Sequence, residues 1–472
     1  MNINNICCIG AGYVGGPTMA VIALKCPDIC VTVVDINPKK INQWNDKNLE
    51  NLPVFEPGLK EIISKTRGIN LFFSKDIDKA IIEAQMIFMA GNTPTKKNGE
   101  GKGFAADLSF VEKCASHIAR VSKTDKIVVE KSTLPVRTAE KIKKVLFENN
   151  NKVKFEVISN PEFLAEGTAI QDLFKSDRVL IGGDSTNSGK NAVNALVKIY
   201  EKWIPKNKIL TTNVWSSELS KLASNAMLAQ RISSINSLSA LCEHTGADIS
   251  EVSLAIGMDS RIGEKFLKPS AGFGGSCFKK DILNLVYLSK FYGLNEVAEY
   301  WHQVIKINDY QKDRFAKIII KNLDGNINGK KISILGWAFK KDTNDSRESS
   351  AIGVTSKLLD EGAKIHVYDP KVSSRSIVSD LIEFWKDKGE SRSEINYKIK
   401  KITIEKTCQD SIRDSFAIAI MTEWEVFKEY DWVNIQDNMV EKPMIFDSRN
   451  IINEKMIDIN KGIFYQLGTP QI

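Results

Sequence analysis

The residue best suited to covalent chemistry is Cys277, which follows a glycine-rich segment, residues 272–275. A helix-patterned apolar run begins at Ile282, so the thiol is expected near the positive end of a helix dipole, which favours the thiolate. Asp281 stands one turn beyond Cys277 and can share its helix face. A buried, inert thiol beside a tight turn is the alternative that this segment alone leaves open.

A second polar pair falls within a long helical pattern, residues 216–242. Lys221 and Asn225 are one turn apart there, on a face that also carries small residues. If this face points inward over a substrate, the ammonium and the amide could hold a developing oxyanion. A lysine on a helix is more often solvated surface, and the spacing alone does not choose between the two. Another long helical pattern, residues 300–320, is expected to cross between two lobes.

A dinucleotide-binding pattern opens the chain. Gly10, Gly12 and Gly15 form G-x-G-x-x-G, after a strand pattern at residues 5–9 and before an apolar helical stretch at 18–24. The first glycine permits a tight turn, the second lets the backbone meet a pyrophosphate, and the third lets the helix pack on the strand. The phosphates would lie at the helix N-terminus, where free N–H groups and the dipole favour anions.

A carboxylate completes this pattern. The next strand, residues 31–34, ends in Asp35, about 20 residues past the last glycine. A carboxylate there accepts hydrogen bonds from the adenosine ribose and repels a 2′-phosphate, so NAD is favoured over NADP. Lys39 and Lys40 weaken that preference slightly.

Polar residues also follow three further strand patterns. Thr93, Thr133 and Glu162 each come after such a pattern, with helical stretches in between. This alternation is typical of a doubly wound sheet. Ligands bind beyond the carboxyl ends of the strands in such sheets, so we expect the three side chains to converge on one crevice. The strand patterns are residues 86–90, 127–129 and 155–158, with one more at 178–181.

The last third of the chain repeats the order of the first. A strand pattern before Gly336, a helix near residues 350–359 and a strand before Asp369 are present, but the later glycines are not. We expect a second nucleotide-binding-type half, with a charged segment, 372–401, forming surface helices and loops. The predicted fold is α/β, with two Rossmann-like doubly wound domains joined by a long-helix central region. The predicted domains are residues 1–212, 213–324 and 325–472.

Composition narrows the class of protein. The 472-residue chain has a net charge of +7 with dispersed basic residues, so nucleic acid is not an expected partner. No apolar run approaches the roughly 18 residues of a membrane span, and no membrane association is expected. Eight scattered cysteines and four distant histidines give no metal-binding signature and are typical of a reduced, cytoplasmic protein.

Six motifs together resemble the UDP-glucose/GDP-mannose dehydrogenase family over nearly the whole chain. Together they are far more specific than the glycine pattern alone. Within the family, the chain is most similar to members that oxidise UDP-glucose. The motifs are GAGYVG (10–15), NTPT (92–95), EKST (130–133), SNPEFLAEGTAI (159–170), GFGGSCFKKD (272–281) and GWAFKKDTNDSRESSAI (336–352).

The resemblance implies oxidation of the UDP-glucose C6 alcohol to the carboxylate of UDP-glucuronate, with two NAD⁺ used in succession. Cys277 would be the nucleophile, forming a thiohemiacetal and then a thioester, which stores the acyl group without releasing the aldehyde. Lys221 and Asn225 would stabilise oxyanions, and Asp281 would order the hydrolytic water or the lysine. Glu162 would act as a general base or position a water.

The same resemblance implies two sets of ligand contacts and a self-associating chain. Thr133 would touch both the cofactor and a catalytic water. Arg261 would be offered across a subunit interface, so a homodimer or higher homo-oligomer is expected. The implied NAD contacts are Gly10, Gly12, Tyr13, Val14, Gly15, Asp35, Lys40, Thr93, Thr133, Glu166 and Arg347. The implied UDP-sugar contacts are Glu162, Phe163, Leu164, Ala165, Glu166, Lys221, Asn225, Arg261, Lys268, Phe273, Gly274, Phe339, Lys340 and Arg449.

Three alternative functions differ in their chemistry. A two-electron dehydrogenase of the hydroxyacid type shares the first-domain pattern but needs no cysteine. A nucleotide-sugar-binding regulator without turnover is not expected to keep Cys277, Lys221 and Asp281 together. A sister enzyme acting on UDP-N-acetylmannosamine or GDP-mannose would keep the mechanism and change the substrate.

Three positions depart from the family pattern. Lys40 stands where an arginine is expected, which leaves the ribose contact less defined. Gly91 replaces a larger apolar residue and is expected to loosen the strand end before NTPT. Pro269 falls inside the expected substrate loop. None of these departures touches the proposed nucleophile or its partners.

Overall fold

The computed structural model describes residues 2–440 and 442–470, and the chain divides into two compact units. The division falls inside two helices, α9 (Val214–Thr245) and α11 (Phe278–Phe291). The three domains predicted from the sequence therefore stay a prediction. The first unit comprises Met1–Ser224 with Leu283–Phe291, and the second comprises Asn225–Ile282 with Tyr292–Ile472.

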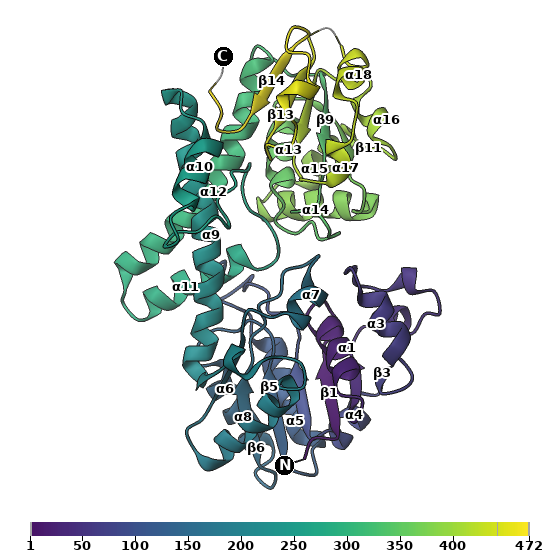
Figure 1. Cartoon of the computed structure of the whole chain (residues 1–472), viewed down its shortest axis with the longest axis vertical. Helices are drawn as coiled ribbons and strands as arrows, with labels where there is room; N and C mark the ends of the chain where they lie inside the picture. The colour runs from purple at the N-terminus through teal and green to yellow at the C-terminus, as the bar shows by residue number, and fades with distance from the viewer. Residues whose placement is uncertain (1, 441, 471–472) are drawn as a thin grey trace. The chain divides into compact units, whose positions relative to one another are not determined.

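The first unit is built on an eight-stranded sheet, drawn in purple to teal in Figure 1. All neighbouring strands are parallel except β6 and β7, which meet antiparallel at Ser159 and Gly182. The strand predicted at residues 178–181 is thus present, but it runs against the strand beside it. In spatial order the strands are β3 (Leu71–Ser74), β2 (Cys30–Val34), β1 (Asn5–Ile9), β4 (Met86–Met89), β5 (Lys126–Glu130), β6 (Phe155–Ser159), β7 (Val179–Gly183) and β8 (Ile209–Asn213).

Side chains of the central strand β1 point alternately into two apolar layers, as the pleat requires. Ile6 and Cys8 belong to the core formed with α1, α3 and α8, while Cys7 and Ile9 belong to the core formed with α4, α5 and α6. Helices therefore cover both faces of the sheet. They are α1 (Gly15–Lys25), α2 (Pro38–Trp44), α3 (Leu59–Thr66), α4 (Ile77–Glu83), α5 (Ser109–Val121), α6 (Thr138–Asn149), α7 (Ala169–Phe174) and α8 (Asn187–Tyr200), with 3₁₀ turns at Leu49–Asn51 and Lys206–Lys208.

The second unit contains a six-stranded sheet in which every neighbouring pair is parallel. This confirms the second doubly wound half predicted from the sequence. In spatial order the strands are β11 (Ile402–Ile404), β10 (Lys364–Tyr368), β9 (Lys331–Leu335), β12 (Ala417–Ile420), β13 (Met444–Asp447) and β14 (Ile463–Gln466). The helices wholly within this unit are α10 (Ile249–Gly257), α12 (Asn295–Asn322), α13 (Ser350–Asp360), α14 (Ser374–Asp387), α15 (Arg392–Ile399), α16 (Cys408–Ile412), α17 (Glu425–Lys428) and α18 (Trp432–Asp437), with a 3₁₀ turn at Glu454–Met456.

One expectation about the helices is wrong. Helix α12 lies wholly in the second unit and does not cross between units; the division falls instead in α9 and α11. The segment 372–401 forms surface helices and loops as expected, and α14 buries one face, with Ile377, Leu381 and Trp385, in the core. Within the described ranges, no helix combines the length and the apolar character that crossing a bilayer requires.

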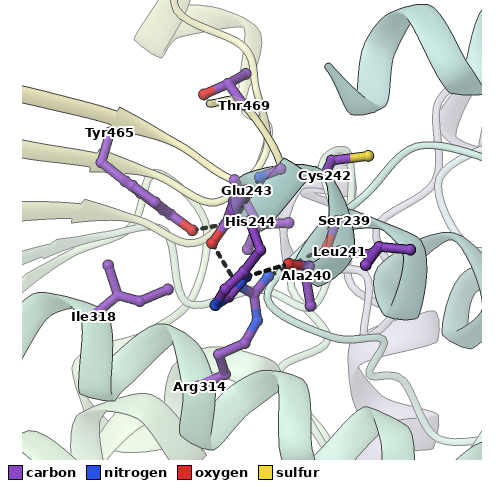
Figure 2. Close-up of polar contacts among 12 residues, drawn as sticks. Ser239, Ala240, Leu241, Cys242, Glu243, His244, Arg314, Ile318, Tyr465 and Thr469 are labelled. Carbon is purple, nitrogen blue, oxygen red and sulfur yellow. Dashed lines mark hydrogen bonds and ion pairs between the residues drawn. The ribbon is translucent and has the colours of Figure 1, made fainter. Parts of the chain in front are cut away.

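A carboxylate on α9 joins the end of the chain to the long helices of the second unit (Figure 2). Glu243 accepts hydrogen bonds from Arg314 and from the Tyr465 hydroxyl, each at 2.6 Å, and from the backbone N–H of Gly468 at 2.8 Å. Arg314 lies on α12 and Tyr465 on β14. Charge-assisted hydrogen bonds shielded from water are strong, so this cluster fixes β14 and the following turn against α9 and α12.

A buried pair of carboxyl groups lies where β5, α6 and α9 of the first unit meet. Glu130 is 1% exposed and Glu218 is 3% exposed. Glu218 accepts hydrogen bonds from the backbone N–H groups of Arg137 at 2.7 Å and Ala139 at 2.8 Å, at the N-terminus of α6. Burial raises the pKa of Glu130 well above its ordinary value, and the neighbouring Glu218 raises it further. The raised pKa favours the neutral acid of Glu130, whose proton can then be shared with Glu218.

This pair predicts a pH-dependent stability. The folded state keeps a proton that the unfolded state releases above its ordinary pKa of 4.5, so the stabilisation is complete below that value. It is lost as the pH rises, by about 1.4 kcal/mol per pH unit for one proton. In Glu130→Gln the amide donates at every pH, so we expect a flatter melting temperature between pH 5 and 8. The control is Glu148→Gln, which neutralises an exposed carboxylate on α6. Equal pH dependence in wild type and Glu130→Gln would contradict the shared proton.

Candidate active site

The G-x-G-x-x-G turn leaves no room for side chains at two of its glycines. Gly10 has φ +118°, and a Cβ there would lie 2.5 Å from the carbonyl oxygen of Ala90. A Cβ on Gly15, where α1 begins, would lie 1.9 Å from the carbonyl oxygen of Gly10. Gly12 faces open space instead. The turn therefore brings backbone N–H groups and the start of α1 to an unobstructed surface, which suits a pyrophosphate.

Asp35 follows β2 and faces this turn. One carboxylate oxygen accepts a hydrogen bond from the backbone N–H of Ala11 at 2.9 Å. The same oxygen forms an ion pair with Lys40 at 3.1 Å. The other oxygen accepts from the N–H of Asn37. Lys40 thus partly neutralises the carboxylate that is predicted to repel a 2′-phosphate. Glycine turn, helix N-terminus and acid are assembled as a dinucleotide-binding unit, and its residues fit NAD.

The ends of β4 and β5 bring together two residues that are predicted to converge. The Thr93 hydroxyl donates to the carbonyl oxygen of Thr133 at 3.0 Å, and the Ser132 hydroxyl donates to that of Gly91 at 2.6 Å. A Cβ on Gly91 would lie 2.0 Å from the Phe110 ring. The strand end is therefore not loosened by the glycine, because the ring fills the space and the loop is hydrogen-bonded.

Glu162, beyond the end of β6, lines a pocket of about 130 Å³ within the first unit. Beside it, the Phe163 ring lies 3.8 Å from the Arg178 guanidinium and 5.2 Å from Lys221 Nζ. Lys221 is 5% exposed, so it is not a solvated surface lysine. Arg178 is not among the site residues predicted from the sequence. Its contact with Phe163 depends on the fold, and no sequence pattern indicates it.

Carboxylates accept hydrogen bonds from the backbone of the predicted substrate segment at residues 165–169. The backbone N–H of Ala165 donates to Asp172 at 2.9 Å. Glu56 accepts from the N–H groups of Gly167 and Ala169, at 2.8 and 3.1 Å. These contacts order the backbone on both sides of Glu166 and leave Leu164 half-buried beside the pocket.

The cysteine loop lies in the second unit and is held by backbone contacts. Gly272 and Gly275 have φ of +120° and +87°, which only glycine adopts readily. Asn308 on α12 accepts from the N–H of Phe273 at 2.7 Å, and the N–H of Gly275 donates to the carbonyl of Arg347 at 2.8 Å. The sequence did not predict this role for Asn308. The residue is 2% exposed on α12, and no sequence pattern distinguishes it from the other polar residues of that helix.

Cys277 is half-buried immediately before α11, as predicted from the sequence. The backbone N–H of Asp281 donates to the carbonyl of Cys277 at 2.9 Å, which closes the first helical turn. The Asp281 carboxylate accepts from the Asn225 amide at 2.6 Å, and Lys280 lies 3.8 Å from it. The structure therefore brings Asn225 and Asp281 together beside the thiol's helix.

The other predicted residues of the second unit form two groups. Arg449 donates to the carbonyls of Phe339 at 3.0 Å and of Met421 at 2.8 Å. The Phe339 ring packs on Gly275, where a Cβ would lie 3.0 Å from it, and beside Gly274. Phe339 therefore lies against the cysteine loop, while Arg449 bonds the Phe339 carbonyl and Lys340 Nζ lies 5.8 Å from the Phe339 ring.

The second group lies at the surface. Arg347 is paired with Asp345, and Arg261 with Asp259. The Arg261 side chain is 87% exposed, and Lys268 is also exposed. Each arginine is thus held by an aspartate two residues before it, and its side chain is exposed to solvent.

Comparison with known proteins identifies the family. A UDP-glucose 6-dehydrogenase of Arabidopsis thaliana is 54% identical over 468 residues, covering 98% of this chain and 97% of that protein. The UDP-glucose 6-dehydrogenase of Mus musculus is 56% identical over 455 residues, covering 96% and 90%. The solved structure of a UDP-glucose dehydrogenase from Pyrobaculum islandicum matches with a TM-score of 0.84 at 28% identity, covering 99% and 98%.

Models of three domains also match the chain. They are the NAD binding domain at residues 4–204, the central domain at 215–310 and the UDP binding domain at 333–454 of the UDP-glucose/GDP-mannose dehydrogenase family. The chain belongs to the UDP-glucose/GDP-mannose dehydrogenase family, and NAD is its cofactor.

The Asp35–Lys40 pair predicts a change in cofactor preference. In Asp35→Asn the amide oxygen still accepts from Ala11, but the charge is lost and Lys40 can pair with a 2′-phosphate. We expect the ratio of kcat/KM for NAD to that for NADP to fall at least about tenfold, the effect of one charge contact. Lys40→Met is the matched variant, because it keeps the acid and should preserve the preference for NAD. An unchanged ratio in Asp35→Asn would show that the carboxylate does not select the cofactor.

Proposed function

We propose that this protein oxidises UDP-glucose to UDP-glucuronate, the reaction of a UDP-glucose 6-dehydrogenase. The observation that carries the proposal is the 54–56% identity to UDP-glucose 6-dehydrogenases over nearly the whole chain. The position of the thiol supports it, since a half-buried cysteine at the start of α11 is suited to nucleophilic attack. When bound, NAD⁺ accepts a hydride from C6 in each of two oxidations.

In the proposed mechanism Cys277 carries the sugar between the two oxidations. Its thiolate adds to the C6 aldehyde and forms a C–S bond, giving a thiohemiacetal. Loss of the second hydride turns this into a thioester. Water then adds to the thioester carbon, the C–S bond breaks, and the carboxylate and the thiol are released. The aldehyde never leaves the protein.

The polar residues of the site have separate roles in the proposed mechanism. Lys221 and Asn225 stabilise the oxyanions that form when the thiolate or water adds to C6. Asp281 fixes the Asn225 amide by the 2.6 Å hydrogen bond and so orients its donor. Glu162 accepts the proton of the attacking water or of the alcohol, and Thr133 contacts the cofactor and that water.

Each unit by itself has a set of proposed UDP-sugar contacts. In the first unit they are Phe163, Leu164, Ala165 and Glu166. In the second unit they are Lys268, Phe273, Gly274, Phe339, Lys340 and Arg449. The ordered backbone around Gly274 and Gly167 supports this assignment, because a preorganised loop loses less entropy on binding. Glu166 and Arg347 are proposed as further NAD contacts.

We also propose that the chain self-associates and that it works in the cytoplasm. Large apolar side chains are exposed in the second unit. They are Leu241 on α9, Leu254 on α10 and Met258 just after α10. Apolar surface of this kind is typical of interfaces. Among the described residues none of the eight cysteines forms a disulfide, which supports a reducing compartment.

A mixing experiment tests whether Arg261 acts on a partner subunit. Arg261→Met and Cys277→Ser chains should each be nearly inactive alone. If the arginine is offered across an interface, a mixed dimer has one intact site, so free mixing should restore about a quarter of wild-type activity. Co-expressed chains with separate tags allow the mixed species to be isolated. A mixed species as inactive as its parents would place Arg261 and Cys277 in the same chain's site.

The NADH yield tests the four-electron reaction. With excess NAD⁺, we expect about two NADH for each UDP-glucose consumed, because both oxidations occur before the product leaves. Cys277→Ser should lose steady-state turnover by about a thousandfold or more, as nucleophile replacement does. Cys30→Ser, another half-buried thiol, is the control. A yield of one would mean release at the aldehyde. Activity only with another nucleotide sugar would identify a sister enzyme.

A further inference from the structure

An arginine of the first unit has no role in the proposed mechanism, although it contacts a residue of the proposed substrate site. Arg178 comes directly before β7 and is half-buried. Its guanidinium carbon lies 3.8 Å from the centre of the Phe163 ring. Its Nη2 donates to the hydroxyl of Ser224 on α9 at 3.3 Å. The side chain therefore joins the start of β7 to α9 and to the segment that follows β6.

A second cation contacts the same ring. Lys221 lies one helical turn before Ser224 on α9, and its Nζ is 5.2 Å from the centre of the Phe163 ring. Lys221 is 5% exposed, so water screens this contact weakly. An aromatic ring attracts a cation within about 6 Å of its centre, and the attraction is stronger where water is excluded. The position of the ring therefore influences the position of the ammonium.

The guanidinium is the group best suited to hold the ring. A guanidinium is planar and stacks on an aromatic face, whereas an ammonium acts as a point charge on a flexible stem. In the described part of the chain, Phe163 has no contact with another aromatic ring. Because Arg178 is also bonded to Ser224, it connects the ring to the helix that carries Lys221.

The arginine is not engaged by the acids around it. It lines the pocket of about 130 Å³, and the carboxylates of Glu162, Asp172 and Asp177 line the same pocket. Asp172 accepts a hydrogen bond from the backbone N–H of Ala165 at 2.9 Å, and Asp177 is exposed. Within residues 2–440 and 442–470, no carboxylate lies within ion-pair distance of Arg178. Its contacts are the ring and α9.

We infer that Arg178 is a positioning residue that holds the Phe163 ring against α9 and thereby fixes the Lys221 ammonium where oxyanions form. The inference rests on the proposed function, because Arg178 has this task only if Lys221 stabilises those oxyanions. Arg178 acts through Phe163 and Lys221. Its loss should therefore lower kcat more than it raises KM, since the oxyanion develops after the substrate is bound.

The first test removes the charge and keeps the hydrogen bond. Arg178→Gln can still donate to Ser224 but cannot make a cation–π contact. We expect kcat to fall about tenfold, while KM for UDP-glucose changes less than about threefold. The control is Lys175→Gln, which removes another, exposed cation from the lining of the same pocket and should leave kcat within about twofold. A wild-type kcat in Arg178→Gln would overturn the inference.

The second test supplies the missing group in solution. Arg178→Ala leaves a gap that adjoins the pocket, which gives a small planar cation access to it. Guanidinium chloride at a millimolar concentration should raise kcat of this variant at least about fivefold. Urea has the same shape without the charge and should not raise it, and sodium chloride controls for ionic strength. Equal effects of guanidinium and urea would contradict the inference. If the alanine variant does not fold, the kcat of Arg178→Gln remains decisive.

The third test asks whether Arg178 acts through the ring. Phe163→Leu removes the aromatic face and keeps an apolar side chain. In this background Arg178→Gln should change kcat less than about twofold, because the contact that it breaks is already absent. A further loss of about tenfold in the double variant would show that Arg178 acts by another route.

A last variant separates this inference from the proposed function. Lys221→Met should lower kcat by about a hundredfold or more, as the loss of an oxyanion donor does. If Lys221→Met turns over like wild type, the proposed mechanism is wrong and the role of Arg178 falls with it. If Lys221→Met loses turnover while Arg178→Gln keeps it, the proposed mechanism stands and only the inference about Arg178 is wrong.

Discussion

The Glu218 carboxylate is the contact on which the arrangement of the first unit's site depends. It binds two backbone N–H groups at the start of α6, and it lies beside the buried Glu130 at the end of β5, whose pKa it raises. Buried hydrogen bonds that water does not weaken thus hold the start of α6 to α9. Glu218 also lies one turn before Lys221 on α9. The loop after β5, with Lys131 and Thr133, and the lysine that faces Phe163 are thus positioned from a single cluster.

In the second unit, hydrogen bonds to backbone groups position the cysteine loop. The Asn308 amide accepts from the N–H of Phe273, the carbonyl of Arg347 accepts from the N–H of Gly275, and the Phe339 ring covers Gly275. At the other end of α9, Glu243 ties the final strand to α12. Both units therefore place reactive residues on helices whose ends are fixed by buried polar contacts, which gives precision that loops alone do not provide.

The sequence predicted the sheets and their order of elements well, because strand, glycine and helix patterns are local. Strand β9 ends just before Gly336 and β10 just before Asp369, as expected, and Cys277 lies at the start of a helix as predicted. The direction of β7 and the extent of α12 within one unit were not predictable, since both depend on tertiary packing. Gly91 shows the same limit, because the space of its missing side chain is filled by the ring of Phe110, nineteen positions further along the chain.

Burial and position at a helix start together explain why Cys277 is suited to the proposed chemistry. Burial raises the pKa of Cys7, Cys8 and Cys114, and it raises that of Cys114 to about 12, so these thiols stay protonated in the core. Cys277 is half-buried at a helix N-terminus, where free N–H groups favour a thiolate. A nucleophile needs both access and a stabilised anion. The glycines of the loop permit the backbone turn that brings the half-buried thiol to the start of the helix. Residue type alone cannot distinguish these cysteines; their place in the fold does.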